Sequence, residues 1–173
     1  MKIRLPVAAL CLSSCIAATP AFAIEYPARK PGLWEMRVGD GGKKAPVDQT
    51  IQQCIDAGSD QAMRDMAQGM GAGKDACSKQ DMRKEGGTTI VDSVCKIGTS
   101  TATTHAVMTG DMSTGYRMDS KSTYSPPFMG KTEGNAVVEA KWVGPCKADQ
   151  KPGDMIMSNG MKMNVLEMMG KKK

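Results

Sequence analysis

Hydrophobic and polar residues alternate along several stretches of the chain, which is the pattern of strands with one buried face. In the first stretch, Trp34, Met36 and Val38 share a face, while Leu33 and Glu35 point the other way. The same alternation predicts strands over residues 32–38, 47–55, 88–97, 99–109, 115–124 and 136–143. Few other segments have a regular period, so the sequence predicts a mainly β protein.

One segment instead has the 3.6-residue period of an amphipathic helix. We expect this helix to start at a cap formed by Ser59 or Asp60 and to run to about Met70. Its apolar stripe consists of Ala62, Met63, Met66, Ala67 and Met70. Glycines at 69, 71 and 73 follow and end it.

Turn signals separate the predicted strands. Pro126-Pro127 interrupts a strand, and residues 151–154 (Lys-Pro-Gly-Asp) form a turn. Asn159-Gly160 predicts a hairpin between Met-Ile-Met and Met-Lys-Met, and Asn164 caps a last helical turn. Short connections without βαβ alternation predict an antiparallel meander of six to eight strands with one short helix. Periodicity leaves a curved sheet and a small barrel open.

The N-terminus has the features of an export signal. Lys2 and Arg4 precede a short apolar run, and Ala21-Phe22-Ala23 precedes the expected cleavage between Ala23 and Ile24. An alternative is a lipoprotein, because Leu12-Ser13-Ser14-Cys15 resembles a lipobox that would leave Cys15 lipidated. No stretch reaches 18 apolar residues, so we expect no transmembrane segment. These features predict a periplasmic protein.

Composition limits what the exported part can be. The chain has 173 residues, which after signal removal leaves one disulfide-stabilised domain (24–153) and a Met- and Lys-rich C-terminal tail (154–173). The net charge of +5 is too small and too scattered to indicate nucleic-acid binding. Aromatic residues make up only 4% of the chain, whereas methionine occurs 16 times, so the core is expected to depend on methionine.

Four cysteines remain after signal cleavage, at positions 54, 77, 95 and 146. An even number in an exported chain predicts two disulfides, with three possible connectivities. We favour sequential pairing, Cys54 with Cys77 and Cys95 with Cys146. These four cysteines form no Cys-x-x-Cys pair, so their spacing does not indicate a metal site.

Catalytic candidates are few. His105 is the single histidine and lies in a threonine-rich strand without a nucleophile motif, so we expect it to be structural. Residues 69–74 resemble a phosphate-binding loop only superficially, because Asp75 replaces the required Ser or Thr. Acid–base catalysis by Glu35 or Asp119 would need a second carboxylate nearby. We therefore expect a protein that is not an enzyme and has no cofactor.

Two binding hypotheses remain. Thioethers favour Cu(I), so the C-terminal methionines form an alternative metal site: Met155, Met157, Met161, Met163, Met168 and Met169. A curved meander with Tyr116, Met118, Tyr124 and Phe128 near the Pro126-Pro127 loop would instead line a groove for a small apolar ligand or an envelope protein. Lys171, Lys172 and Lys173 are expected to be a solvated helix end.

The sequence Pro31-Gly32-Leu33-Trp34-Glu35 near the mature N-terminus resembles the signature of a bacterial exported family catalogued as domain of unknown function 3617. Gln52-Gln53-Cys54, a helix followed by Cys77, and the later pair Cys95 and Cys146 are shared features. The resemblance covers residues from about 31 to 146 and implies export and a small β-rich fold. It implies no activity, ligand or catalytic residue.

Overall fold

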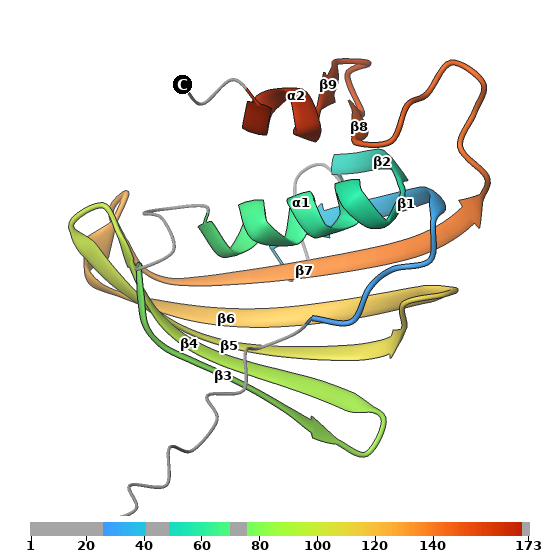
Figure 1. Cartoon of the computed structure of the whole chain (residues 1–173). Helices are drawn as coiled ribbons and strands as arrows, with labels where there is room; N and C mark the ends of the chain where they lie inside the picture. The colour runs from blue at the N-terminus through green and yellow to red at the C-terminus, as the bar shows by residue number, and fades with distance from the viewer. Residues whose placement is uncertain (1–25, 41–48, 70–75, 171–173) are drawn as a thin grey trace, which may run out of the picture.

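A single antiparallel sheet dominates the protein. The structure, a computed structural model, describes residues 26–40, 49–69 and 76–170. Within them nine strands pair in the order β3-β4-β5-β6-β7-β1-β2-β8-β9, and β3 and β9 form open edges. The sheet curves strongly, and helix α1 lies against its concave side (Figure 1).

The strands are β1 (Gly32–Gly39), β2 (Gln49–Ile55), β3 (Cys77–Glu85), β4 (Thr88–Ile97), β5 (Ser100–Asp111), β6 (Gly115–Phe128), β7 (Lys131–Gly144), β8 (Asp154–Met157) and β9 (Lys162–Asn164); the helices are α1 (Ala57–Gly69) and α2 (Val165–Gly170). The predicted antiparallel meander is confirmed for β3 to β7. The sheet is open rather than closed into a barrel. It has nine strands, because the C-terminal hairpin β8–β9 adds to it.

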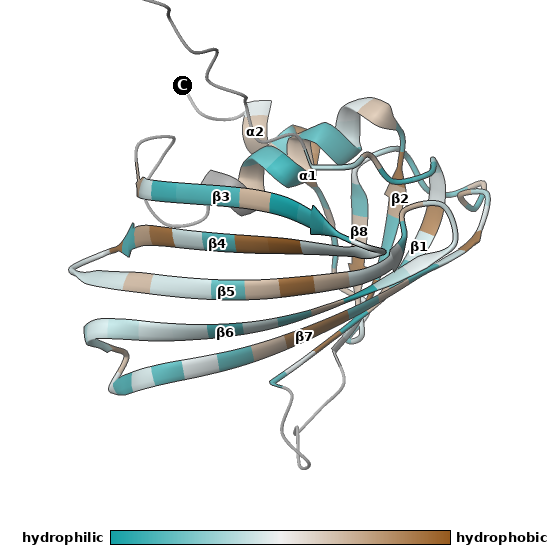
Figure 2. Ribbon diagram, turned by 90° about the horizontal axis from the view of Figure 1, so that it is seen from below, coloured by the Kyte–Doolittle hydropathy of each residue, from teal (hydrophilic) through white to brown (hydrophobic). Residues whose placement is uncertain are grey.

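Successive side chains of the long strands point to opposite faces of the sheet. In β6, Tyr116 and Met118 lie on the concave face and are half-buried, whereas Arg117 and Asp119 are exposed on the convex face. Hydrophobic and hydrophilic positions alternate in the same way along β7 (Figure 2). The parity predicted from the sequence is therefore confirmed, and it determines which side chains reach the space under α1.

Helix α1 begins three residues earlier than the sequence predicts. Asp56 is the N-cap, because its Oδ1 accepts a hydrogen bond from the Ser59 backbone N–H at 2.8 Å. The Ser59 hydroxyl in turn accepts one from the Asp56 backbone N–H at 2.9 Å, which completes a capping box. The predicted caps were therefore wrong: Ser59 belongs to the first turn, and Asp60 is free to bind elsewhere.

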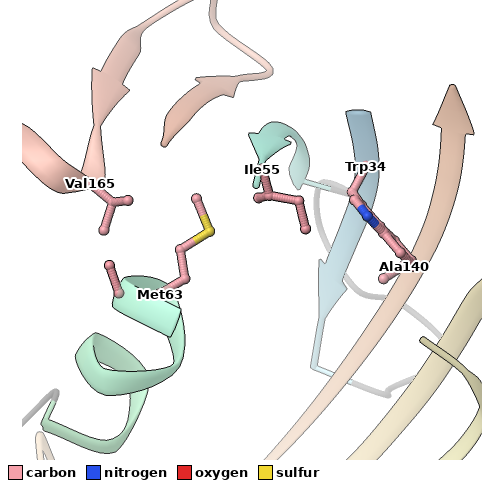
Figure 3. Close-up of a cluster of buried hydrophobic side chains, with 6 residues drawn as sticks. Trp34, Ile55, Met63, Ala140 and Val165 are labelled. Atoms are coloured by element: carbon pink, nitrogen blue, oxygen red, sulfur yellow. The ribbon is translucent and has the colours of Figure 1, made fainter. Parts of the chain in front are cut away.

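The hydrophobic core lies where α1 meets β1, β2 and α2. Its buried members are Trp34, Ile55, Ala62, Met63, Ala140 and Val165 (Figure 3). Trp34 and Val165 are 0% exposed. Because Val165 belongs to α2, the C-terminal segment that we expected to be a separate tail contributes directly to the core.

Hydrogen bonds hold this C-terminal segment in place. Asn164 Oδ1 accepts from the backbone N–H of Leu166 at 3.0 Å, so the predicted cap of the last helix is confirmed. Asp154 is buried, and burial alone would raise its pKa. Hydrogen bonds from the Lys151 backbone, the Asn164 amide and the Lys162 ammonium outweigh burial and lower the pKa of Asp154 to about 2. The carboxylate is therefore ionised at neutral pH, and it joins β8 to β9.

The Pro-Gly-Leu-Trp-Glu sequence has a structural explanation. Gly32 adopts φ +131°, and a Cβ there would lie 2.5 Å from the Gly144 carbonyl oxygen, so only glycine fits. The carbonyl of Pro31 accepts a hydrogen bond from the Trp142 indole at 3.0 Å, and that of Lys30 accepts one from Trp34 at 2.8 Å. These contacts fix the path of residues 26–31 before β1 begins.

Both disulfides are present, but the predicted pairing was wrong. Cys54 bonds to Cys146, and Cys77 bonds to Cys95. Sequential pairing assumed that a disulfide between Cys54 and Cys77 closes the segment that contains α1. In the structure, β1 instead lies between β2 and β7. Leu33 is the register partner of both Cys54 and Gly144, so Cys146, two residues after β7, reaches Cys54 across β1. Cys77 and Cys95 are direct partners on β3 and β4.

Candidate functional site

A cavity of about 310 Å³ lies between α1 and the concave face of the sheet. This volume corresponds to about ten molecules of liquid water and falls at the lower end of the range for small-molecule sites. The lining residues come from α1, from β1, β2, β5, β6, β7 and β8, from the turn between β5 and β6, and from the segment before β1. The cavity is thus bordered by elements from both ends of the chain, and it is partly open to solvent.

Methionine dominates the cavity wall. Thioether side chains are flexible and polarisable, so they fit apolar ligands of different shapes. The seven methionines of the wall are Met36, Met63, Met66, Met108, Met112, Met118 and Met155. Tyr26, Pro27, Tyr116 and Val138 supply most of the remaining apolar surface. The wall is therefore suited to the apolar part of a ligand.

Three charged side chains line the same cavity. Asp60, 1% exposed, accepts a hydrogen bond from Arg29 Nε at 2.7 Å and from the Arg29 backbone N–H at 3.1 Å. Arg64, one turn further along α1, forms an ion pair with Asp60 Oδ2, and Arg29 Nε binds Oδ1. Two guanidinium groups thus share one carboxylate, and the cluster carries one net positive charge.

The outer edge of the Arg29 guanidinium faces one amide oxygen and two thioethers. Nη1 donates to Gln53 Oε1 at 2.8 Å and lies 3.7 Å from Met36 Sδ. Nη2 lies 3.4 Å from Met63 Sδ. A thioether is a poor acceptor compared with an oxyanion. Two of the groups that face Nη1 and Nη2 of Arg29 are therefore soft sulfur atoms. The guanidinium also lies over the Trp34 ring, with its Cζ 5.9 Å from the ring centroid.

Two phenols complete the polar inventory of the cavity. Burial raises the pKa of Tyr116, an effect that the nearby Arg29 partly opposes. Burial also raises the pKa of Tyr26. Since the ordinary value is near 10, both hydroxyls are neutral at physiological pH. Neither phenol therefore offsets the positive charge of the arginines.

The structure divides the predicted aromatic groove. Tyr116 and Met118 line the cavity, as expected. Tyr124 and Phe128 contact one another instead, with ring centroids 5.7 Å apart, near the end of β6, and neither lines the cavity. The four residues thus lie in two places, because β6 is longer than the part that α1 covers (Figure 1) and its register with β7 shifts between Thr123 and Phe128.

The six C-terminal methionines are also distributed over different environments. Met155 lines the cavity and is the register partner of Met163 on β9, while Met157 shares the parity of Met155 on β8. The other three are exposed: Met161, Met168 and Met169. The C-terminal methionines therefore do not form one enclosed cluster.

The catalytic candidates lie away from the cavity, on the convex face. His105 is half exposed, and its Nδ1 is 2.6 Å from Asp92 Oδ1 on the neighbouring strand. Asp119 pairs with Arg117 at 2.7 Å, and Glu35 lies 3.9 Å from Arg37. Of the phosphate-loop resemblance, only residue 69 belongs to the part of the chain that the structure describes. Within that part, no three His, Cys, Asp or Glu side chains converge as metal ligands.

Sequence reasoning missed the polar cluster of the cavity. Arg29 precedes the first predicted strand and has no periodic pattern to reveal it. Asp60 and Arg64 are four residues apart, a spacing typical of helix ion pairs, and would have been recognised had Asp60 not been assigned as a cap. Met36 shares the buried parity of β1 with Trp34, but parity alone does not distinguish core from cavity.

Export is consistent with the described structure. Two disulfides are typical of an oxidising compartment. No helix among residues 26–40, 49–69 and 76–170 is long and apolar enough to cross a membrane. The predicted cleavage site between Ala23 and Ile24, the alternative lipidation site Cys15, and the three final lysines all lie outside the described residues.

Comparison with known proteins gives a family without a function. No curated protein and no solved structure matches the chain. A family model described as "Protein of unknown function (DUF3617)" matches residues 29–146, more than half of the chain. The match begins at Arg29 and ends at Cys146, so it includes both arginines of the cavity and both disulfides. The chain belongs to the DUF3617 family.

Proposed function

We propose that this protein is exported to the periplasm and acts there as a non-enzymatic binding or envelope-accessory protein that holds a small apolar ligand in the methionine-lined cavity. The observation that carries the proposal is the cavity itself: about 310 Å³ of space in a wall of seven methionines. Methionines that only filled the core would pack against one another, whereas these seven side chains border a hollow beside the core cluster.

The position of the remaining chemistry supports binding rather than catalysis. The only histidine, His105, is on the convex face and already paired with Asp92, whereas the cavity is on the concave face. The charged groups of the cavity are two arginines and a carboxylate bound by both of them. Such a set can orient a ligand by charge and by hydrogen bonds.

Filling the cavity tests the proposal. We expect the neutral dye N-phenyl-1-naphthylamine to bind the wild-type protein saturably at one site, with the rise in fluorescence that follows burial in an apolar environment. Val138 lines the cavity, so Val138→Trp should weaken dye binding by at least about tenfold, because the larger side chain occupies ligand space.

Val137→Trp is the matched control. Val137 is the next residue of β7 and points to the opposite face, so the same substitution there should leave dye affinity unchanged. The proposal fails if the wild-type protein does not bind the dye. It also fails if Val138→Trp and Val137→Trp bind the dye equally well while both remain folded.

Cu(I) binding by the C-terminal methionines is the second candidate function. The observation that favours it is the register of the hairpin, which puts Met155 opposite Met163. Replacing both residues by leucine should then release Cu(I) to a competing chelator at least about tenfold more readily. Met129→Leu is the control, because Met129 lies in the turn between β6 and β7 and is 86% exposed. Unchanged copper affinity in the double variant would eliminate this site.

A further inference from the structure

The charges of the cavity indicate which class of ligand it would take. Resting on the proposed function, we propose that the ligand is a small amphipathic acid, with an oxyanion head group at Arg29 and Arg64 and an apolar body along the methionines. A wholly apolar ligand would need no charged group in the wall. The cavity instead contains two guanidinium groups and only one carboxylate.

The hydrogen bonds of Asp60 leave the positive charge uncompensated. Its two oxygens already accept from Arg29 Nε, the Arg29 backbone N–H and Arg64 Nη1. Tyr26 and Tyr116, the other ionisable groups of the wall, are neutral because burial raises their pKa values. The cavity wall therefore carries one net positive charge, which an anionic head group would complement.

Arg29 is the side chain with the right donors for this charge. It is 9% exposed, and its fixed position comes from Asp60 on one edge and Gln53 beside it. Its Nη1 and Nη2 also face Met36 Sδ and Met63 Sδ. Methionine side chains are flexible, so a carboxylate or phosphate can displace them and accept shorter, charge-assisted hydrogen bonds from the same guanidinium.

The same geometry disfavours a cation at this end of the cavity. The sulfur atoms of Met36 and Met63 face guanidinium protons, so Cu(I) bound to these sulfurs would lie beside a fixed positive charge. A quaternary ammonium group would meet the same repulsion. The cavity methionines are therefore the apolar surface of an acid-binding site, and Met155 is the one residue that they share with the C-terminal copper candidate.

Ligands that differ only in their head group test this inference. Decanoate, decanol and decyltrimethylammonium would each compete with N-phenyl-1-naphthylamine bound to the wild-type protein. We expect decanoate to displace the dye at a concentration at least about tenfold below that of decanol, and the ammonium to be the weakest competitor. Decyl phosphate distinguishes the two acid types, since binding tighter than that of decanoate would identify a phosphate ligand.

A charge-removing variant locates the effect. Arg64→Gln keeps a polar side chain beside Asp60 and Gln61, and it should reduce the preference for decanoate over decanol by at least about threefold. Arg37→Gln makes the same change of charge on the convex face and should leave that preference as in the wild type. The ratio of decanoate to decanol is measured within each variant, so a small loss of stability does not change its meaning.

The outcomes separate this inference from the proposed function. If the dye does not bind, the proposed function is wrong, and the proposal of an acidic ligand is wrong as well. If the dye binds and decanol competes as well as decanoate, or the ammonium competes best, the cavity remains a binding site and the acidic ligand is wrong. Equal loss of preference in Arg64→Gln and Arg37→Gln would also contradict a head-group site at Arg64.

Discussion

Replacement of Trp34 by alanine should lower the free energy of unfolding by about 3–5 kcal/mol, a large part of the stability of a domain of this size. Trp34 is 0% exposed and lies between the core around Ile55 and the cavity residue Tyr116. The ring centroids of Trp34 and Tyr116 are 6.0 Å apart. Its indole N–H also binds the Lys30 carbonyl, so the variant loses packing area and leaves that carbonyl without its partner.

Urea unfolding followed by circular dichroism measures this loss. Leu166→Ala is the control, because Leu166 is 42% exposed on α2 and should change the free energy of unfolding by less than about 0.5 kcal/mol. A loss below about 1 kcal/mol for Trp34→Ala would mean that the arrangement of α1, β1 and the segment before β1 is not as described.

Removal of the Cys54–Cys146 disulfide should cost more than removal of the Cys77–Cys95 disulfide. The first bond joins residues 92 apart in sequence and the second joins residues 18 apart. In the chain-entropy model these separations correspond to about 4.6 and about 3.2 kcal/mol of stability. The Cys54→Ala/Cys146→Ala protein is therefore expected to unfold at a distinctly lower urea concentration than Cys77→Ala/Cys95→Ala.

The two double variants serve as controls for each other, since each removes one bond and two sulfur atoms. Peptide mapping of the unreduced wild-type protein should recover Cys54 linked to Cys146. Recovery of Cys54 linked to Cys77, the pairing expected from the sequence, would contradict the order of β1 between β2 and β7. Greater loss from the Cys77–Cys95 pair would contradict the entropic explanation alone.

Local patterns of the sequence were sufficient to predict most of the fold. Alternation in β6 and β7, the hairpin at Asn159-Gly160 and the Asn164 cap are each determined by residues close in the chain. The position of β1 beside β7 is different, because it depends on strands about 100 residues apart that no local period relates. The disulfide pairing was wrong for the same reason.

The site was predictable only in part. Tyr116 and Met118 follow from the parity of β6, and Met63 and Met66 follow from the helical stripe of α1. Arg29 has no such signal, since it lies in an irregular segment whose path depends on tertiary hydrogen bonds to Trp34 and Trp142. A stripe of methionines identifies a buried face, but whether that face is packed or hollow depends on the elements opposite it.

The most direct test of the central proposal is a methyl spectrum of protein labelled with carbon-13 at the methionine methyl groups, recorded during titration with decanoate. We expect the signals of the seven cavity methionines to shift together and to saturate at one equivalent. The signals of the exposed residues Met129, Met161, Met168 and Met169 should remain in place. Shifts confined to the exposed methionines, or no shifts at all, would contradict a ligand-binding cavity under α1.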